Sequence, residues 1–317
     1  MSTKPEVTNS GASTARGGDL GNRLFSALLA AMLIVFLTAT LLVLLSNVWY
    51  LAHAEDKDGE SGWQIFAGAL HDPEVHFAVR LSVTTALLTM IVSLVFAIPA
   101  AYVLSRYHFR GEKLVDTILD LPIVVPPPII GISLLMFFKT PVGDLVNHLT
   151  PGFMVTAINW FLTIATGNPE HPITDDGTTW VYTTRGIVMA QFFVACAFGV
   201  RAIKATFDTI GVRHEQVART LGCTRAQAFF KVVLPMAATG LVAGAVMTWA
   251  RAIAEFGPVL FFCSSTRWKT EVMPISMFLM YSSDDFEKAV ALVIIMVLIS
   301  TITLLAFKRL GGKGYLW

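Results

Sequence analysis

The chain has 317 residues and a mass of 34.6 kDa; 55% of its residues are hydrophobic, only 14% are charged, and its mean hydropathy is +0.65. Soluble domains carry roughly 25% charged residues, so the composition excludes a soluble enzyme and a disordered chain. The net charge of +1 excludes a nucleic-acid binder driven by global positive charge. Cys196, Cys223 and Cys263 lie far apart, which indicates neither a disulfide framework nor a zinc site.

The chain begins with a polar segment, 1–22, rich in Ser, Thr, Gly and Ala, which we predict to be a disordered tail. The apolar run Leu24–Leu51 follows. It is much longer than the apolar core of a secretory signal, about 7–15 residues, and about 20 apolar residues cross a bilayer. We therefore predict that 23–76 contains an uncleaved anchor helix followed by an external loop.

Further apolar runs of spanning length follow the anchor, and with it they make six predicted spans. These runs are Phe77–Leu104, Ile118–Phe138, Gly186–Ala205, Pro235–Phe262 and Ala289–Phe307. Barrel strands would be shorter and would alternate in polarity, so helices are the expected spanning structure. The predicted fold class is an all-α, polytopic membrane helix bundle with its core at 77–307. An external insertion, 140–184, holds the shorter apolar segment Phe153–Thr166, which we interpret as an interfacial or re-entrant helix.

The distribution of Lys and Arg sets the predicted orientation, because cytoplasmic loops carry an excess of these residues. Placing the N-terminus inside puts most of the basic loop residues on the cytoplasmic side. This topology also places the 308–317 tail and the loop 206–234 in the cytoplasm. We expect a multi-pass protein of the cell membrane, in contact with the lipid bilayer and with both termini cytoplasmic.

The loop 206–234 is the most unusual cytoplasmic segment. Gly222 suits the left-handed position that ends a helix, and Thr224 with Gln227 forms a capping box that begins the next one. Phe229, Val232 and Val233 then make an apolar stripe at helical spacing. Spacing alone leaves two explanations open: the stripe packs on its own bundle or the lipid surface, or it docks another protein.

The same loop resembles the EAA loop of ABC-transporter permease subunits, in which a Gly is followed by a Phe, an aliphatic residue and Leu-Pro before a span. Gln216 stands where the motif has Glu, and Glu215 lies one residue earlier. The resemblance implies a coupling helix that inserts into a separate ATP-binding subunit, and it favours docking. The residues implied to couple this chain to the ATPase are Gln216, Val217, Ala218, Leu221, Gly222, Phe229, Val232, Leu234 and Pro235.

Two charged residues, Arg251 and Glu255, lie inside the fifth predicted span. Charges at membrane depth are costly, and residues four apart on one helix face can neutralise each other. They form either a structural ion pair or a polar element that lines or gates a pathway, and we favour the pathway. Gly257 and Pro258 follow directly and should bend the helix.

The stretch from Ala250 to Gly257 resembles the A-R-A-[LI]-[GA]-E-F-G signature of oxyanion permeases, the importers of molybdate, tungstate and sulfate. The stretch from Leu121 to Gly131, which contains the prolines 126–128, is similar to that family's L-P-x-x-x-P-P-x-x-x-G. As structure alone, the prolines are a kink; in this family they are expected to shape the passage. The residues implied for the pathway or gate are Arg251, Glu255, Phe256, Gly257, Pro126 and Pro127.

The resemblance implies the permease subunit of an ATP-driven importer similar to type I ABC importers, carrying molybdate, or else tungstate or sulfate. It implies two ATP-binding subunits, an external oxyanion-binding protein and a second permease copy as partners. The chain lacks a G-x-x-x-x-G-K-[ST] loop and HExxH or GxSxG motifs, so we predict no catalytic residue, cofactor or metal in it. The alternative is a secondary transporter coupled to an ion gradient. We interpret the acids and histidines around Asp72 as a helix start rather than a metal site.

Overall fold

A computed structural model describes residues 14–54, 59, 61–150, 152–167 and 179–310, and its regular elements in these ranges are helices. The chain divides into two compact units, 1–62 and 63–317. The first contains α1 (Thr14–His53), which includes the predicted anchor helix. This helix begins inside the predicted 1–22 tail, whose residues 1–13 lie outside the described ranges.

Apart from Gly62, the helix α2 (Gly62–His71) belongs to the second unit; it is a short helix within the segment predicted to be an external loop. The next helix, α3 (Pro73–Arg106), starts one turn earlier than the predicted span. The predicted helix start is confirmed: the Glu74 backbone N–H donates to the Asp72 side chain over 2.8 Å, and Pro73 occupies the first turn. The polar residues around Asp72 therefore begin a helix, as the sequence indicates.

The core of this unit consists of α3, α8 (Thr184–Thr209) and α12 (Ala238–Ile253), which pack against one another. The buried face of α3 carries small side chains, which allow helix backbones to approach closely in a membrane. These residues are Ala78, Ser82, Thr85, Ala86, Thr89, Ser93, Ala97 and Ala101. Between the helices, the Thr89 hydroxyl donates to Gln191 Oε1 over 2.9 Å, which satisfies polar groups that water cannot reach.

The predicted span Ile118–Phe138 is not one straight helix. It consists of α4 (Glu112–Val124) and α5 (Pro127–Phe137), which meet at an angle of 110°. The bend falls at Val125 and Pro126, because consecutive prolines cannot donate the backbone hydrogen bonds that would continue α4. An apolar cavity of about 420 Å³ lies at the bend, lined by Leu121, Pro122, Val125, Ile130, Ser133, Leu134, Phe137 and Phe193.

The predicted span Pro235–Phe262 is also divided. The loop 206–234 is predicted to couple the chain to an ATPase and is called the coupling loop below. It contains α9 (Val212–Thr220), α10 (Arg225–Ala228) and the π-helical turn η1 (Phe229–Val233). It leads through α11 (Leu234–Met236) into α12, with a bend of 74°. The chain then leaves the helix after Ile253 and resumes as α13 (Gly257–Cys263), with Pro258 in its first turn. A proline fits there because its missing N–H is unpaired at a helix start in any case.

The remaining helices are α6 (Pro141–Leu149), α7 (Gly152–Thr166), α14 (Met273–Ser282) and α15 (Phe286–Leu310). Within the part of the chain that the structure describes, four helices are long and apolar enough to cross a membrane, or up to six if each bent pair counts as one span. The predicted polytopic all-α fold is confirmed. The sequence did not predict α14 as a separate helix, and residues 168–178 of the 140–184 insertion lie outside the described ranges.

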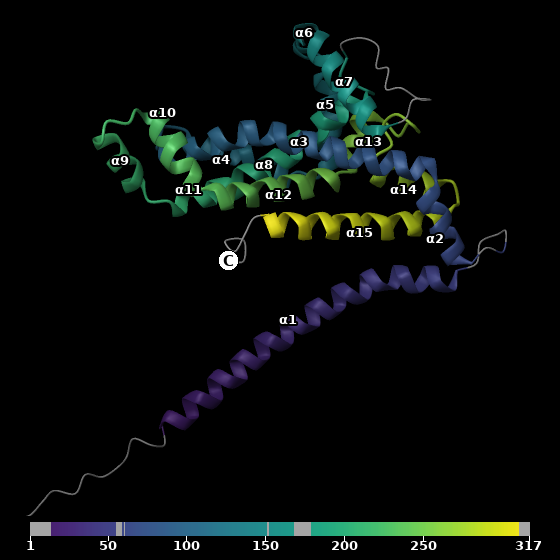
Figure 1. The fold of residues 1–317 in the computed structure, drawn as a ribbon, viewed down its shortest axis with the longest axis horizontal. Coiled ribbons are helices and arrows are strands. Elements are labelled where there is room, and N and C mark those ends of the chain that lie inside the picture. The colour runs from purple at the N-terminus through teal and green to yellow at the C-terminus, as the bar shows by residue number, and fades with distance from the viewer. Residues whose placement is uncertain (1–13, 55–58, 60, 151, 168–178, 311–317) are drawn as a thin grey trace, which may run out of the picture. The chain divides into compact units, whose positions relative to one another are not determined.

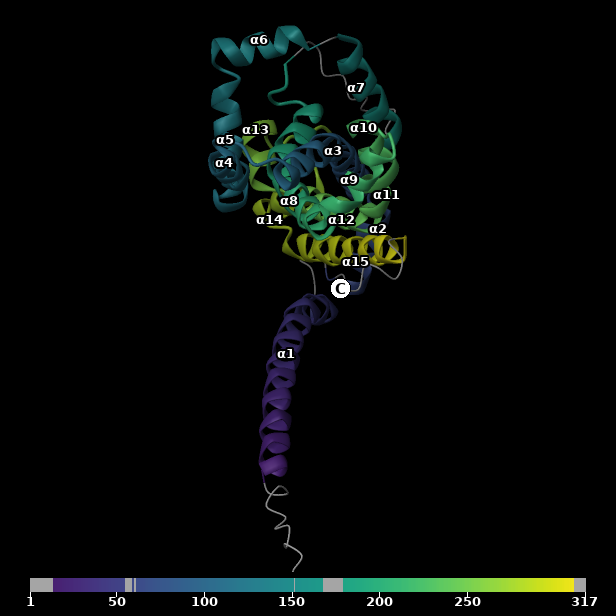
Figure 2. The same ribbon diagram turned by 90° about the vertical axis from the view of Figure 1, so that its left-hand side faces the viewer.

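Within this unit, α9, α10 and α11 lie at one end of the long core helices, while α13 and α14 lie at the other (Figure 1). The helices of the insertion, α6 and α7, lie on the opposite side of the core from α15 (Figures 1 and 2). This arrangement separates the coupling loop from the segment that carries Arg251 and Glu255.

Candidate functional site

The two motifs attributed to the pathway meet where α5 and α13 cross. A Cβ added to Gly131 would lie 2.7 Å from Pro258 Cα, and one added to Gly257 would lie 2.7 Å from Pro128 Cγ. Each helix therefore presents a glycine to a proline of the other. Both positions need glycine because a side chain would not fit between the helices, and not because the backbone is in a left-handed conformation. The broken segments thus form one junction, which the sequence did not predict.

Arg251 and Glu255 form the expected ion pair, with 2.8 Å between Arg251 Nη1 and Glu255 Oε2. The Glu255 side chain is only 2% exposed, whereas that of Arg251 is 26% exposed and lies over the Phe198 ring at 5.6 Å. The prediction that one helix face carries both residues is wrong, because α12 ends at Ile253. The pair instead joins the end of α12 to the connection before α13.

The other predicted pathway residues lie around this connection and the α4–α5 bend. Phe256 precedes α13, and its ring centroid is 5.5 Å from that of Phe278 on α14. Pro126 is exposed at the bend, and Pro127 begins α5 half-buried. The structure therefore places every predicted pathway residue at one of two helix breaks, and Gly131 with Pro258 brings these breaks together.

The corner of the coupling loop has the local structure that its sequence predicts. Gly222 has φ of +94°, a left-handed conformation in which side chains are strained. The Cys223 N–H donates to the Ala218 carbonyl over 3.1 Å. Thr224 and Gln227 form a reciprocal capping box, with bonds of 2.9 and 3.2 Å. The corner between α9 and α10 is therefore defined by its own hydrogen bonds.

The apolar residues of this loop face in two directions. Leu221 and Val217 are 81% and 50% exposed. Phe229 is half-buried against Tyr102 and Phe207. Among the other predicted coupling residues, Gln216, Gly222 and Pro235 are exposed, Val232 and Leu234 are half-buried, and Ala218 is buried. The predicted stripe that begins at Phe229 thus packs largely on its own bundle. The most exposed apolar side chain of the loop is Leu221 at the corner, and Phe230 beside Phe229 is also 64% exposed.

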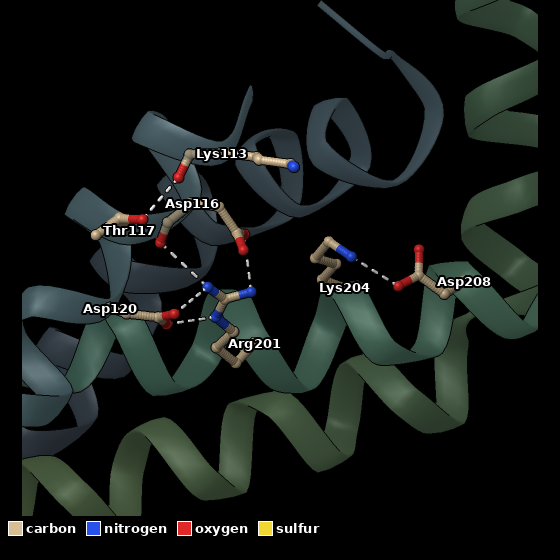
Figure 3. A network of polar contacts seen from close by, with 7 residues as sticks. All are labelled: Lys113, Asp116, Thr117, Asp120, Arg201, Lys204 and Asp208. Atoms are coloured by element: carbon tan, nitrogen blue, oxygen red, sulfur yellow. Dashed lines mark hydrogen bonds and ion pairs between the residues drawn. The ribbon is translucent and has the colours of Figure 1, made fainter. Parts of the chain in front are cut away.

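A polar network that the sequence did not predict joins α4 to α8, where Arg201 contacts two carboxylates one turn apart (Figure 3). Arg201 Nη1 lies 2.8 Å from Asp116 Oδ1, and the guanidinium also hydrogen-bonds both carboxylate oxygens of Asp120. Beside it, Lys204 pairs with Asp208 over 2.8 Å. The spacing of Asp116 and Asp120 indicates that one face of α4 carries two carboxylates, but it does not identify their partner, which lies on a helix distant in sequence.

A second missed group lies in the loop between α13 and α14. Glu271 is fully buried and accepts a hydrogen bond from the Trp268 backbone N–H over 3.1 Å. Burial raises the pKa of Glu271 to about 7, and the neighbouring Glu74 carboxylate acts in the same direction. Arg267 Nε pairs with Glu74 over 3.2 Å. Among the described residues, no group of three or more His, Cys, Asp or Glu is arranged to hold a metal ion.

Residues 93–313 match the family described as the binding-protein-dependent transport system inner membrane component. The chain belongs to this family. The matched region contains both helix breaks, the coupling loop and the Arg251–Glu255 pair. The family's description and the spanning helices together make the chain a multi-pass component of an inner membrane, as the sequence predicted.

Several permease proteins are similar to this chain over most of its length. The molybdenum transport system permease protein ModB of Escherichia coli is 33% identical, covering 76% of this chain and 95% of that one. The molybdate/tungstate permease protein WtpB of Thermococcus kodakarensis is 33% identical, covering 74% and 77%. The sulfate permease protein CysT of Salmonella typhimurium is 28% identical, covering 80% and 83%.

The fold is similar to that of a bacterial ABC transporter involved in the import of the acidic polysaccharide alginate. The match has a TM-score of 0.65 and 18% identity, and it covers 92% of this chain and 97% of that one. The second alginate transporter structure, in complex with an alginate pentasaccharide-bound periplasmic protein, also has a TM-score of 0.65. At this identity the similarity is one of fold.

Proposed function

We propose that the chain is the permease subunit of an ATP-driven importer for a tetrahedral oxyanion, with molybdate as the first candidate and tungstate and sulfate as the alternatives. The observation that carries this proposal is the similarity to molybdate, molybdate/tungstate and sulfate permeases over about three quarters of the chain. The contact between the two motif segments at Gly131 and Pro258 supports it.

The proposed assembly contains two copies of this chain, two ATP-binding subunits and an external oxyanion-binding protein. The ATP-binding subunits contact the corner of the coupling loop, where Leu221 is exposed beside the left-handed Gly222. In the proposed membrane topology the corner and both termini lie in the cytoplasm, and the loop between α13 and α14 lies outside. This orientation agrees with the excess of Lys and Arg in the loops on the same side as the corner.

In this mechanism, ATP binding brings the two ATP-binding subunits together and moves the attached corners with them. The core helices carry that movement to the helix breaks, where Arg251 attracts the anion and the paired Glu255 limits how tightly it is held. ATP hydrolysis then lets the corners of the two copies move apart again, and the ion is released to the cytoplasmic side. The chain itself contributes the passage, and the energy comes from its partner.

Copurification in mild detergent tests the docking surface. We expect a P-loop ATPase to copurify with the wild-type chain in a one-to-one ratio, and to be lost with Leu221→Asp or Gly222→Pro. Leu149→Asp is the matched control, because Leu149 is 68% exposed but lies on α6. An ATPase that copurifies equally with all four chains contradicts docking at the corner.

A transport assay separates the proposal from a gradient-coupled secondary transporter. Uptake of labelled molybdate by the reconstituted complex should require ATP and the binding protein, and should persist when an uncoupler removes the ion gradient. Uptake by the chain alone that collapses with the uncoupler would support the secondary transporter instead. Competition by unlabelled tungstate and sulfate ranks the three anions.

A further inference from the structure

Tyr102, near the end of α3, contacts both arms of the coupling loop. Its hydroxyl donates to Glu215 Oε1 over 2.8 Å, and Glu215 lies in the first turn of α9, before the corner. Its ring packs edge-on against Phe229 of η1, after the corner, with centroids 4.6 Å apart. One side chain of a core helix therefore joins two segments that approach it from opposite sides of Gly222.

Arg106, one turn further along α3, strengthens the same junction. Its Nη2 donates to the Ile210 carbonyl at the end of α8 over 2.9 Å, and its Nε lies 3.7 Å from Glu215 Oε2. The side chains of Arg106 and Glu215 are only 6% and 12% exposed, so water and salt screen their attraction little. Arg106 thus attaches the connection between α8 and α9 to the end of α3.

The aromatic contacts extend this junction into the core. The Tyr102 ring also meets Phe207 of α8 edge-on at 5.8 Å, and Phe207 lies 6.4 Å from Phe229. Phe207 is fully buried between α3 and the loop. A displacement of α9 or η1 therefore acts on α3 and α8 together, the two helices with the most extensive contact in the unit.

We propose that Tyr102 is a positioning residue for energy coupling: its bond to Glu215 and its packing on Phe229 transmit movement of the corner to α3. This inference rests on the proposed function. The role of Tyr102 also explains why this chain has Glu at 215 and Gln at 216, where the EAA motif has its Glu: Glu215 points into the bundle, while Gln216 is exposed. Glu215 serves the intramolecular contact, and position 216 remains free for a partner.

The test uses the full complex in lipid vesicles, with the ATP-binding subunit and binding protein, and measures molybdate transported per ATP hydrolysed. Tyr102→Phe removes the bond to Glu215 but keeps the ring that packs on Phe229. We expect the transport ratio to fall about tenfold, the scale of a lost hydrogen bond to a buried charge, while ATPase copurification and basal hydrolysis stay unchanged. Glu215→Leu removes the acceptor and should give a similar loss, and the double variant should add little to either.

Tyr107→Phe is the matched control, since Tyr107 follows α3 directly and is 41% exposed; it should keep the wild-type ratio. An unchanged ratio in Tyr102→Phe overturns the inference and leaves the proposed function standing. A Tyr102→Phe chain that no longer copurifies with the ATPase also overturns it, because the residue would then serve assembly. Absence of ATP-dependent transport by the wild-type complex overturns the proposed function, and the inference with it.

Discussion

Gly131 on α5 and Pro258 on α13 approach so closely that a Cβ on Gly131 would lie 2.7 Å from Pro258 Cα and 2.8 Å from its carbonyl oxygen. Both atoms belong to the backbone, so neither can turn away as the end of a flexible side chain would. This contact fixes the two broken segments against each other beside Arg251 and Glu255.

The first prediction follows from this contact. Gly131→Ala should destabilise the protein by about 1–3 kcal/mol, because the added methyl group forces α5 and α13 apart. Thermal unfolding in detergent measures the change as a lower Tm. Gly68→Ala is the control, since nothing lies within 4 Å of its added Cβ; equal Tm values for both variants would contradict the close approach.

The second prediction concerns the buried ion pair. Arg251→Gln leaves the Glu255 carboxylate buried without its counter-ion, which should cost about 3–5 kcal/mol. The double variant Arg251→Gln, Glu255→Gln removes both charges and should recover most of that stability. If Arg251 attracts the anion, the double variant should still fail to transport molybdate.

Thermal unfolding and vesicle uptake together separate these two roles of Arg251. Arg110→Gln, a change to an exposed arginine, serves as the control for both measurements. Intact uptake in Arg251→Gln would remove Arg251 from the pathway. Recovery of uptake in the double variant would show that the pair has a structural role only.

A third prediction addresses the network that attaches α4 to α8 before the bend. Arg201 and its two carboxylates are each about one-third exposed or more, so solvent screening reduces their contribution. A double-mutant cycle of Arg201→Gln and Asp120→Asn should give a coupling energy of about 1 kcal/mol. Lys204→Gln, which breaks only the neighbouring pair within α8, should change stability by about 0.3–0.5 kcal/mol.

The pH dependence of stability tests Glu271. Burial raises its pKa from 4.5 to about 7, so the folded state favours the protonated carboxyl. This contribution to stability is complete below about pH 4.5 and is lost as the pH rises to about 7. The Tm of the wild type should therefore fall across this range relative to that of Glu271→Gln.

The groups that face Glu271 provide a second arm of this test. Glu74→Gln removes the neighbouring carboxylate and should lower the pKa of Glu271, so the loss of stability should end at a lower pH and be smaller. Arg267, which pairs with Glu74 in the wild type, is not substituted in either variant. Identical pH profiles for the wild type and Glu271→Gln would show that Glu271 does not titrate in this range.

The sequence predicted features whose causes are local. Long apolar runs predicted the membrane helices, because the bilayer sets the length of a span. Gly222, Thr224 and Gln227 predicted the corner, and Asp72 the start of α3, because a helix end is satisfied by residues within a few positions. The corner and the start of α3 formed as expected, two of the predicted spans are divided by bends, and the motifs around these elements indicated the family.

Only the tertiary structure decided which distant residues meet. The contact of Gly131 with Pro258, the bond from Tyr102 to Glu215 and the burial of Glu271 each join segments far apart in the chain. It also turned Phe229 toward the bundle and left Leu221 exposed at the corner. The periodicity of the sequence shows which residues share a helix face. The bends at 125–126, 237 and 254–256 decide what that face contacts, because each bend changes the direction of the helix that follows it.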